Sequence, residues 1–171
     1  MKNFIIKNLK NISLFCLIAT MVAIFLFSAQ SAEESSKLSG RIVTVVIRIV
    51  MPSYDNLPFL EQQQIREKVT FVVRKIAHFT EFMALGFFLM LYLFCVYTKI
   101  KLFYIAFFSW VGGTFYAVTD EIHQMFVSGR YPAVTDVVID SSGVLFGIIF
   151  LLVLMKIYSL KYLSENSKIL L

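Results

Sequence analysis

Ionisable and polar side chains recur at helical spacing in three apolar stretches of the sequence. In the first stretch, Arg74, His78 and Glu81 are four and three residues apart, so a helix would align them on one face. An imidazole and a carboxylate can serve as general base and acid, and together they can hold a divalent metal ion. A guanidinium group binds phosphate or carboxylate through paired hydrogen bonds. This face therefore predicts acid–base, metal or anion-binding chemistry.

The second stretch ends with a dense group of such side chains. Asp120, His123 and Gln124 would share one helix face, with Glu121 beside them. Paired histidine and carboxylate ligands suit Zn²⁺ or Mn²⁺. However, His78 and His123 belong to different helices, and the spacing matches no standard metal motif. A metal site is therefore one alternative here, beside acid–base catalysis.

The third stretch begins with two acids and continues with two glycines on the same stripe. Asp136, Asp140, Gly143 and Gly147 follow one another at helical spacing. Glycines four residues apart allow helix backbones to approach closely. An Asp at the centre of a membrane span costs about 2.5–3.5 kcal/mol. Asp140 should therefore face the interior of a helix bundle, where it can find a partner.

The composition indicates which elements must carry these residues. Of the 171 residues, 58% are hydrophobic and 16% are charged, and the mean hydropathy is +0.77. Soluble domains are usually about a quarter charged, so much of this surface must face lipid. A helix of about 20 apolar residues spans a bilayer. The sequence predicts one all-α integral membrane domain over residues 1–171, with spans at residues 11–29, 76–97, 102–119 and 137–158.

The first span has a second interpretation, as a signal peptide. It follows a basic start, and its small residues would permit cleavage after Ser31. Its apolar run is nevertheless long enough to cross the bilayer, and further spans follow it. We therefore favour an uncleaved helix.

The connection after the first span predicts a helix that lies on the membrane. Its polar start can cap a helix, and Leu38–Met51 is rich in Val and Ile with basic residues on one face. This stretch is too short to span but suits the interface. Pro52 and Pro58 should break the chain, and a polar helix should run from Phe59 into the second span. The expected fold is a bundle of about four transmembrane helices plus a short interfacial amphipathic helix within residues 31–58.

The basic residues predict the orientation of the bundle. With both termini in the cytoplasm, the cytoplasmic flanks are rich in lysine and contain one acid. All three polar stripes then lie at the outer end of their helices, beside Gln30 and Ser31 at the end of the first span. The charged residues of the cytoplasmic flanks are Lys2, Lys7, Lys10, Lys99, Lys101, Lys156, Lys161, Glu165 and Lys168.

The outer end carries more acids than cations. Protons, a metal ion or a cationic ligand group would restore the balance, because a membrane interior rarely tolerates so many ionisable groups. Alternatively, pairs such as Arg74 with Glu81 could lock the helices in register. Arg130 lies in a predicted tight turn, where it would either clamp a phosphate or carboxylate or form a salt bridge at the rim. The acids are Glu81, Asp120, Glu121, Asp136 and Asp140, and the cations are Arg74, Lys75 and Arg130.

Two other kinds of site are disfavoured. Cys16 and Cys95 lie inside apolar runs and predict small buried hydrophobic residues rather than a disulfide. The net charge of +5 comes from Lys and Arg scattered between apolar runs, without an aromatic-basic RNA motif or zinc-finger spacing. Nucleic-acid binding is therefore not expected.

These residues resemble the VanZ-like family, which is named for a protein associated with resistance to the glycopeptide teicoplanin. The resemblance implies a polytopic protein of the bacterial plasma membrane that is linked to the cell envelope. Its least family-like part is the insert from Leu38 to Pro58. The matching motifs are Phe27-Ser28-Ala29-Gln30-Ser31, Arg74-Lys75-x-x-His78-Phe79-x-Glu81-Phe82 with Leu85-Gly86, Asp120-Glu121-x-His123-Gln124 with Gly129-Arg130, and Asp136-x-x-x-Asp140-x-x-Gly143-x-x-x-Gly147.

Two functions remain open, and a third ranks last. The first is a non-catalytic protein that binds membrane lipids or a lipid-linked or lipidated envelope molecule. The second is a membrane-embedded enzyme that uses acid–base groups or a divalent metal on such a lipid. The third is a transporter, since buried acids also form proton relays. The ligand-binding candidates are Gln30, Ser31, Arg74, Lys75, Gln124, Arg130, Asp136 and Asp140, and the catalytic candidates are His78, Glu81, Asp120, Glu121 and His123.

Overall fold

The computed structural model describes residues 2–131 and 133–167, with side chains throughout these ranges except at residues 2–7, 32, 38 and 160–167. All regular secondary structure in this part of the chain is helical, which confirms the predicted all-α class. The elements are α1 (Lys2–Ser28), α2 (Ala32–Val50), the short 3-10 helix η1 (Tyr54–Asn56), α3 (Phe59–Val96), α4 (Leu102–Gln124) and α5 (Val134–Ser167).

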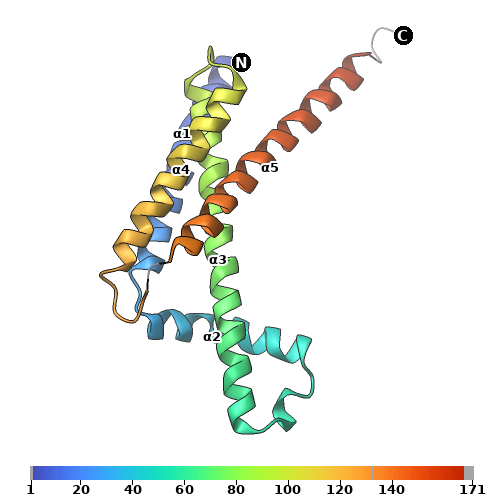
Figure 1. The fold of residues 1–171 in the computed structure, drawn as a ribbon. Coiled ribbons are helices and arrows are strands. Elements are labelled where there is room, and N and C mark those ends of the chain that lie inside the picture. The colour runs from blue at the N-terminus through green and yellow to red at the C-terminus, as the bar shows by residue number, and fades with distance from the viewer. Residues whose placement is uncertain (1, 132, 168–171) are drawn as a thin grey trace.

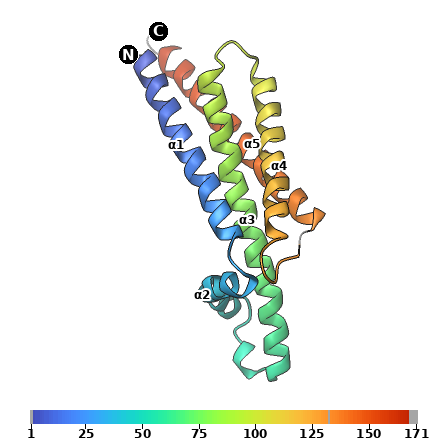
Figure 2. The same cartoon turned by 90° about the vertical axis from the view of Figure 1, so that its left-hand side faces the viewer.

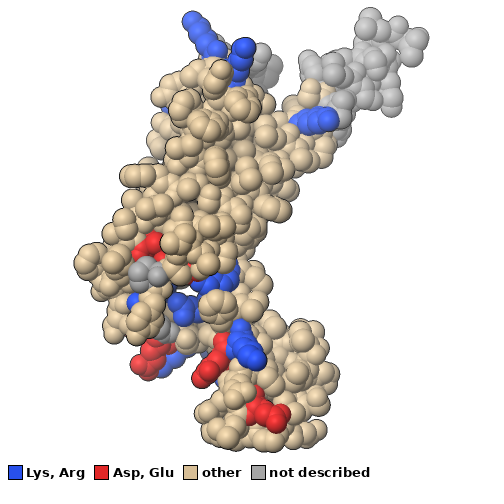
Figure 3. Space-filling model, in the orientation of Figure 1, with Lys and Arg blue, Asp and Glu red and all other residues tan. Residues whose placement is uncertain are grey.

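Four helices, α1, α3, α4 and α5, are long and apolar enough to cross a membrane. The chain is therefore a multi-pass membrane protein with the expected number of spans. On the face shown in Figure 3, charged side chains gather toward the two ends of the molecule and leave an uncharged band along the bundle. Such a band suits contact with lipid tails.

Helix α3 is the centre of the fold and contacts α1, α2, α4 and α5. Its 38 residues extend over about 57 Å at 1.5 Å per residue, whereas the hydrocarbon core is about 30 Å thick. The N-terminal part of α3 must therefore reach beyond the bilayer. Figures 1 and 2 show this part projecting past the ends of α1 and α4, with α2 lying across it. The prediction of a polar helix running from Phe59 into the second span is confirmed.

The crossing of α3 and α5 is close because glycines line it. A Cβ atom at Gly143 would lie 2.5 Å from the carbonyl oxygen of Phe79, and one at Gly147 would collide with the carbonyl oxygen of Met83. The two backbones are therefore in direct contact, as the small-residue pair predicted. This contact fixes the rotation of α5 about its axis, so Asp140, less than one turn before Gly143, also faces α3.

Helix α2 begins with a capping box. The Ser31 hydroxyl accepts from the Glu34 backbone N–H, while the Glu34 carboxylate accepts from the Ser31 backbone N–H at 2.9 Å. The predicted polar cap is thus confirmed. Val43 and Ile47 are buried, whereas Ile49 is 74% exposed. An exposed apolar face suits a helix in the membrane interface, which stays a prediction for α2.

The two ends of the bundle differ. In Figures 1 and 2, α1 begins and α5 finishes at one end, while α1 and α4 finish and α5 begins at the other. The start of α1 and the end of α5 therefore lie on one side, and the cytoplasmic location of both termini stays a prediction. Several residues behind that prediction lie outside the described side chains, namely Lys2, Lys7, Lys161, Glu165 and Lys168.

Candidate functional site

Arg130 links α1 to α4 at the end of the bundle where both helices finish. Its side chain is 8% exposed. It donates from Nε to the Gln30 carbonyl oxygen, from Nη1 to the Gln124 side-chain oxygen and from Nη2 to the Phe27 carbonyl oxygen, each at 3.0 Å. The Phe27 and Gln30 carbonyl groups lie at and just beyond the C-terminus of α1, where carbonyls lack regular helical partners. The alternative of a rim salt bridge is wrong, because Arg130 is buried and bonded to neutral oxygens.

The turn before Arg130 explains how this side chain reaches inward. Gly129 has a φ of 73°, a left-handed conformation that glycine adopts without steric cost. The Arg130 backbone N–H donates to the Val127 carbonyl oxygen at 3.2 Å, which closes the turn. The predicted tight turn is thus confirmed, and it directs Arg130 back toward α1.

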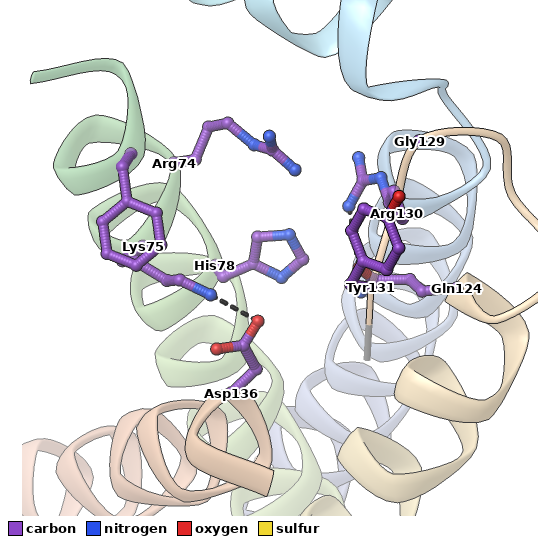
Figure 4. A pocket seen from close by; sticks show the side chains of 9 residues that line it. Arg74, Lys75, His78, Gln124, Gly129, Arg130, Tyr131 and Asp136 are labelled. Atoms are coloured by element: carbon purple, nitrogen blue, oxygen red, sulfur yellow. Dashed lines mark hydrogen bonds and ion pairs between the residues drawn. The ribbon is translucent and has the colours of Figure 1, made fainter. Parts of the chain in front are cut away.

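A cavity of about 260 Å³, here called the cationic cavity, lies between α3 and the α4–α5 loop. Figure 4 shows Arg74, Lys75 and His78 extending from α3 toward the loop that carries Arg130. Lys75 forms an ion pair with Asp136 at the start of α5. The cavity is lined by Phe71, Arg74, Lys75, His78, Gln124, Gly129, Arg130, Tyr131 and Asp136.

Arg74 differs from the other cations of this cavity in having no bonded partner. Within the described part of the chain it makes no hydrogen bond and no ion pair, so the predicted pair with Glu81 does not form. Burial and, after it, the positive charge of Arg74 lower the pKa of Arg130. Like charges thus face each other across the cavity. An anion between them would relieve this repulsion.

A second cavity of about 220 Å³, the apolar cavity, adjoins the first between α1, α2 and α3. Phe27, Ile42, Val73 and Ala77 give it mostly apolar walls. It shares three lining residues with the cationic cavity, namely Arg74, His78 and Arg130. A polar and an apolar compartment therefore meet at the same three side chains.

Behind these cavities, His78 meets two buried acids from different helices. One ligand atom each from His78, Asp120 and Asp140 lies within 4.8 Å of the other two. Asp120 accepts hydrogen bonds on Oδ2 from the Ser28 hydroxyl and the Gln124 amide, both at 2.8 Å. The predicted convergence of α3, α4 and α5 thus holds in the geometry of these three residues, here called the His–Asp cluster.

The remaining predicted site residues have separate surroundings. Glu81 lines the apolar cavity, with one buried carboxylate oxygen that has no hydrogen-bond partner. Glu121 accepts from the Ala133 backbone N–H at 3.1 Å. His123 stacks on Phe25 of α1 with ring centroids 4.5 Å apart and lines neither cavity.

Two other predicted ligand-binding residues also take structural roles. Ser31 caps α2, and the backbone of Gln30 accepts from Arg130. The Gln30 residue lines the apolar cavity as well. Asp136 and Gln124, which were also predicted to bind a ligand, both line the cationic cavity.

Ser28 is a site residue that the sequence reasoning missed. It is fully buried and donates to Asp120, 92 positions away in the chain. A serine inside an apolar span has no titratable group, so a search for ionisable residues passes over it. Phe71 and Tyr131, which line the cationic cavity, were also missed, because neither carries a charge at neutral pH. The position of Ser28 in the Phe27–Ser31 motif was the one available signal.

Comparison with known proteins identifies the family of the chain. The sequence model of the VanZ/LLP1 family matches residues 13–156, a range that includes every residue of both cavities and of the His–Asp cluster. No curated protein and no solved structure matches the chain. The family match covers most of the 171 residues, and on this ground the chain belongs to the VanZ/LLP1 family.

Proposed function

We propose that this protein binds the anionic head group of a lipid-linked or lipidated molecule of the bacterial cell envelope. The observation that carries the proposal is the meeting of the two cavities at Arg74, His78 and Arg130. An amphiphile has one charged end and one apolar end, and it needs both compartments side by side. A soluble anion would need the cationic cavity alone.

The head group belongs in the cationic cavity. Arg74 has no bonded partner among the described residues, and its guanidinium faces the cavity (Figure 4). Its planar fork of donors suits a phosphate or carboxylate. Arg130 already uses three of its five donors on α1 and Gln124, so fewer of them remain for a ligand than on Arg74. Arg74 is therefore the residue expected to contact the ligand directly.

The apolar end of the ligand belongs beside α2. Phe27, Ile42 and Val73 line the apolar cavity. Exposed apolar side chains such as Ile49 continue along α2 toward lipid. A tail that leaves the cavity would thus stay in an apolar environment. This arrangement favours an acyl or prenyl chain over a purely polar ligand.

The biological setting is part of the proposal. We place the protein in the bacterial plasma membrane with both termini in the cytoplasm, which puts the two cavities at the outer leaflet. Teicoplanin carries a lipid tail and acts on wall precursors at that face. Binding of such a molecule would contribute to teicoplanin tolerance, in line with the name of the VanZ family.

The test compares Arg74→Gln with a matched Arg48→Gln control. Arg48 is an exposed arginine of α2 that lines neither cavity. Purified protein in detergent is titrated with phosphatidylglycerol or phosphatidylcholine and examined by native mass spectrometry. We expect the parent and Arg48→Gln to prefer the anionic lipid, and Arg74→Gln to lose about tenfold in affinity. Equal binding by all three proteins, or no preference for the anionic lipid, would overturn the proposal.

A further inference from the structure

We infer that His78, Asp120 and Asp140 hold one divalent cation, of the Mn²⁺ or Zn²⁺ class, at the meeting point of α3, α4 and α5. The inference goes beyond head-group binding and does not rest on it. It starts from the three side chains of the His–Asp cluster, whose ligand atoms lie within 4.8 Å of one another.

Asp140 provides the first argument, because it is buried without a bonded partner. It is 1% exposed, and its Oδ2 atom has no hydrogen-bond partner in the described structure. The Nδ1 atom of the His78 imidazole lies 3.9 Å from Oδ2. A hydrogen bond would draw these atoms to about 2.7–3.2 Å. Two ligands of one ion at about 2.1 Å each would lie roughly 3–4 Å apart, so the observed separation suits a shared ion better.

Asp120 is held in place as a metal ligand would be. Ser28 and Gln124 both donate to its Oδ2 atom, at 2.8 Å. No described side chain donates to Oδ1, so that oxygen is free to bind an ion. Carboxylate ligands of metals are commonly oriented by such hydrogen bonds. Gln124 is in turn fixed by Arg130, which extends the support to the α4–α5 loop.

The charges of the cluster provide an independent argument. Asp120 and Asp140 are both buried inside membrane-spanning helices, and no described Lys or Arg lies within 4 Å of either carboxylate. Two adjacent carboxylates in such surroundings are costly unless a cation compensates them. A divalent ion would neutralise both, and the His78 imidazole would complete a three-residue ligand set.

The ligand types indicate the class of ion. Imidazole suits Zn²⁺ and carboxylates suit Mn²⁺ and Mg²⁺, so a mixed set favours Mn²⁺ or Zn²⁺. Three protein ligands also leave coordination positions open to water or to an oxygen of a bound molecule. His78 lines the cationic cavity, so these positions would be reached from there.

The experiment measures metal binding to the full chain in detergent, without any lipid ligand. Mn²⁺ is titrated into the parent, Asp140→Asn and the matched control Asp55→Asn, and free Mn²⁺ is followed by electron paramagnetic resonance. Asp55 is an exposed acid of η1, far along the chain from the cluster. We expect one saturable site per chain in the parent and the control, and at least a tenfold weaker site in Asp140→Asn. Zn²⁺ should displace the bound Mn²⁺.

Two outcomes would overturn the inference. One is a parent protein that binds neither ion at one per chain, and the other is an Asp140→Asn protein that binds as the parent does. Should Asp140→Asn not fold, the parent titration still decides, and Asp120→Asn supplies the second variant. None of these readings depends on phosphatidylglycerol binding, so the two proposals can fail separately.

Discussion

The crossing of α3 and α5 and the end of the bundle around Arg130 are held together in different ways. At the crossing, glycines 143 and 147 bring one backbone against the other, and no polar side chain is needed. At the Arg130 end, long polar side chains bridge helices that are further apart, and two cavities remain between them. Close contact between backbones fixes the helix arrangement at the crossing, whereas hydrogen bonds fix it at the Arg130 end.

This difference shows how a small membrane protein can tolerate unpaired groups. Close packing at the crossing stabilises the bundle through dispersion contacts that require no water. The Arg130 end can then retain Arg74 and one oxygen of Asp140 without partners. Functional sites commonly keep groups that are unfavourable for stability. The comparison yields four predictions, of which the first concerns the crossing.

Gly147→Ala should have the largest effect, because its Cβ atom would collide with the Met83 backbone oxygen. Overpacking against backbone cannot be relieved by a side-chain rotation, so we expect a loss of about 3 kcal/mol or more in the free energy of unfolding. The control is Gly112→Ala, whose Cβ would make an ordinary contact of 3.5 Å with Leu89. Unfolding in detergent mixtures measures both, and equal stability of the two variants would contradict the close crossing.

Arg130→Gln should be the next most severe change and should differ from Arg74→Gln. Arg130 makes three hydrogen bonds to α1 and Gln124, so its loss should cost about 2–4 kcal/mol. Arg74 makes none, so Arg74→Gln should leave the free energy of unfolding within about 0.5 kcal/mol of the parent. The pair is measured in the same unfolding assay. A large loss from Arg74→Gln would mean that the residue is structural.

Ser28→Ala should cost about 1 kcal/mol, because a buried hydroxyl no longer donates to Asp120. Thr80→Ala is the control, since the exposed Thr80 hydroxyl bonds only the backbone of its own helix turn. The Ser28 variant should also bind Mn²⁺ more weakly if Ser28 orients Asp120. Unchanged stability and unchanged metal affinity would together remove Ser28 from the site.

Glu34→Gln should have the smallest effect, confined to the first turn of α2. Hydrogen bonds from the Ser31 backbone and hydroxyl lower the pKa of Glu34 below its ordinary value of 4.5. A lowered pKa stabilises the folded turn above pH 4.5, and this contribution is lost as the pH falls below that value. Amide-exchange protection factors of residues 34–37 should thus fall on acidification in the parent but not in Glu34→Gln. The same pH response in both would exclude the cap as its source.

Much of the fold could be predicted because its signals are local. The lengths of the apolar stretches predicted the number of spans, and the polar residues after the first span predicted the cap at Ser31. The absence of a helix-breaking residue after Phe59 predicted the long helix α3. Each signal involves residues within a few turns of one another. The limits of the spans were less well predicted, since the apolar helix predicted at residues 102–119 runs to Gln124.

The sequence by itself determined that the chain spans a membrane with four helices and that ionisable residues recur on one face of three of them. Only the tertiary structure decided their partners. It separated His123, which stacks on Phe25, from His78, which meets Asp140, and it gave Arg130 three bonds and Arg74 none. Helical spacing defines a face of one helix, but the neighbour of that face depends on how each helix is rotated. That rotation is set by distant contacts, such as the glycines of α5 against α3.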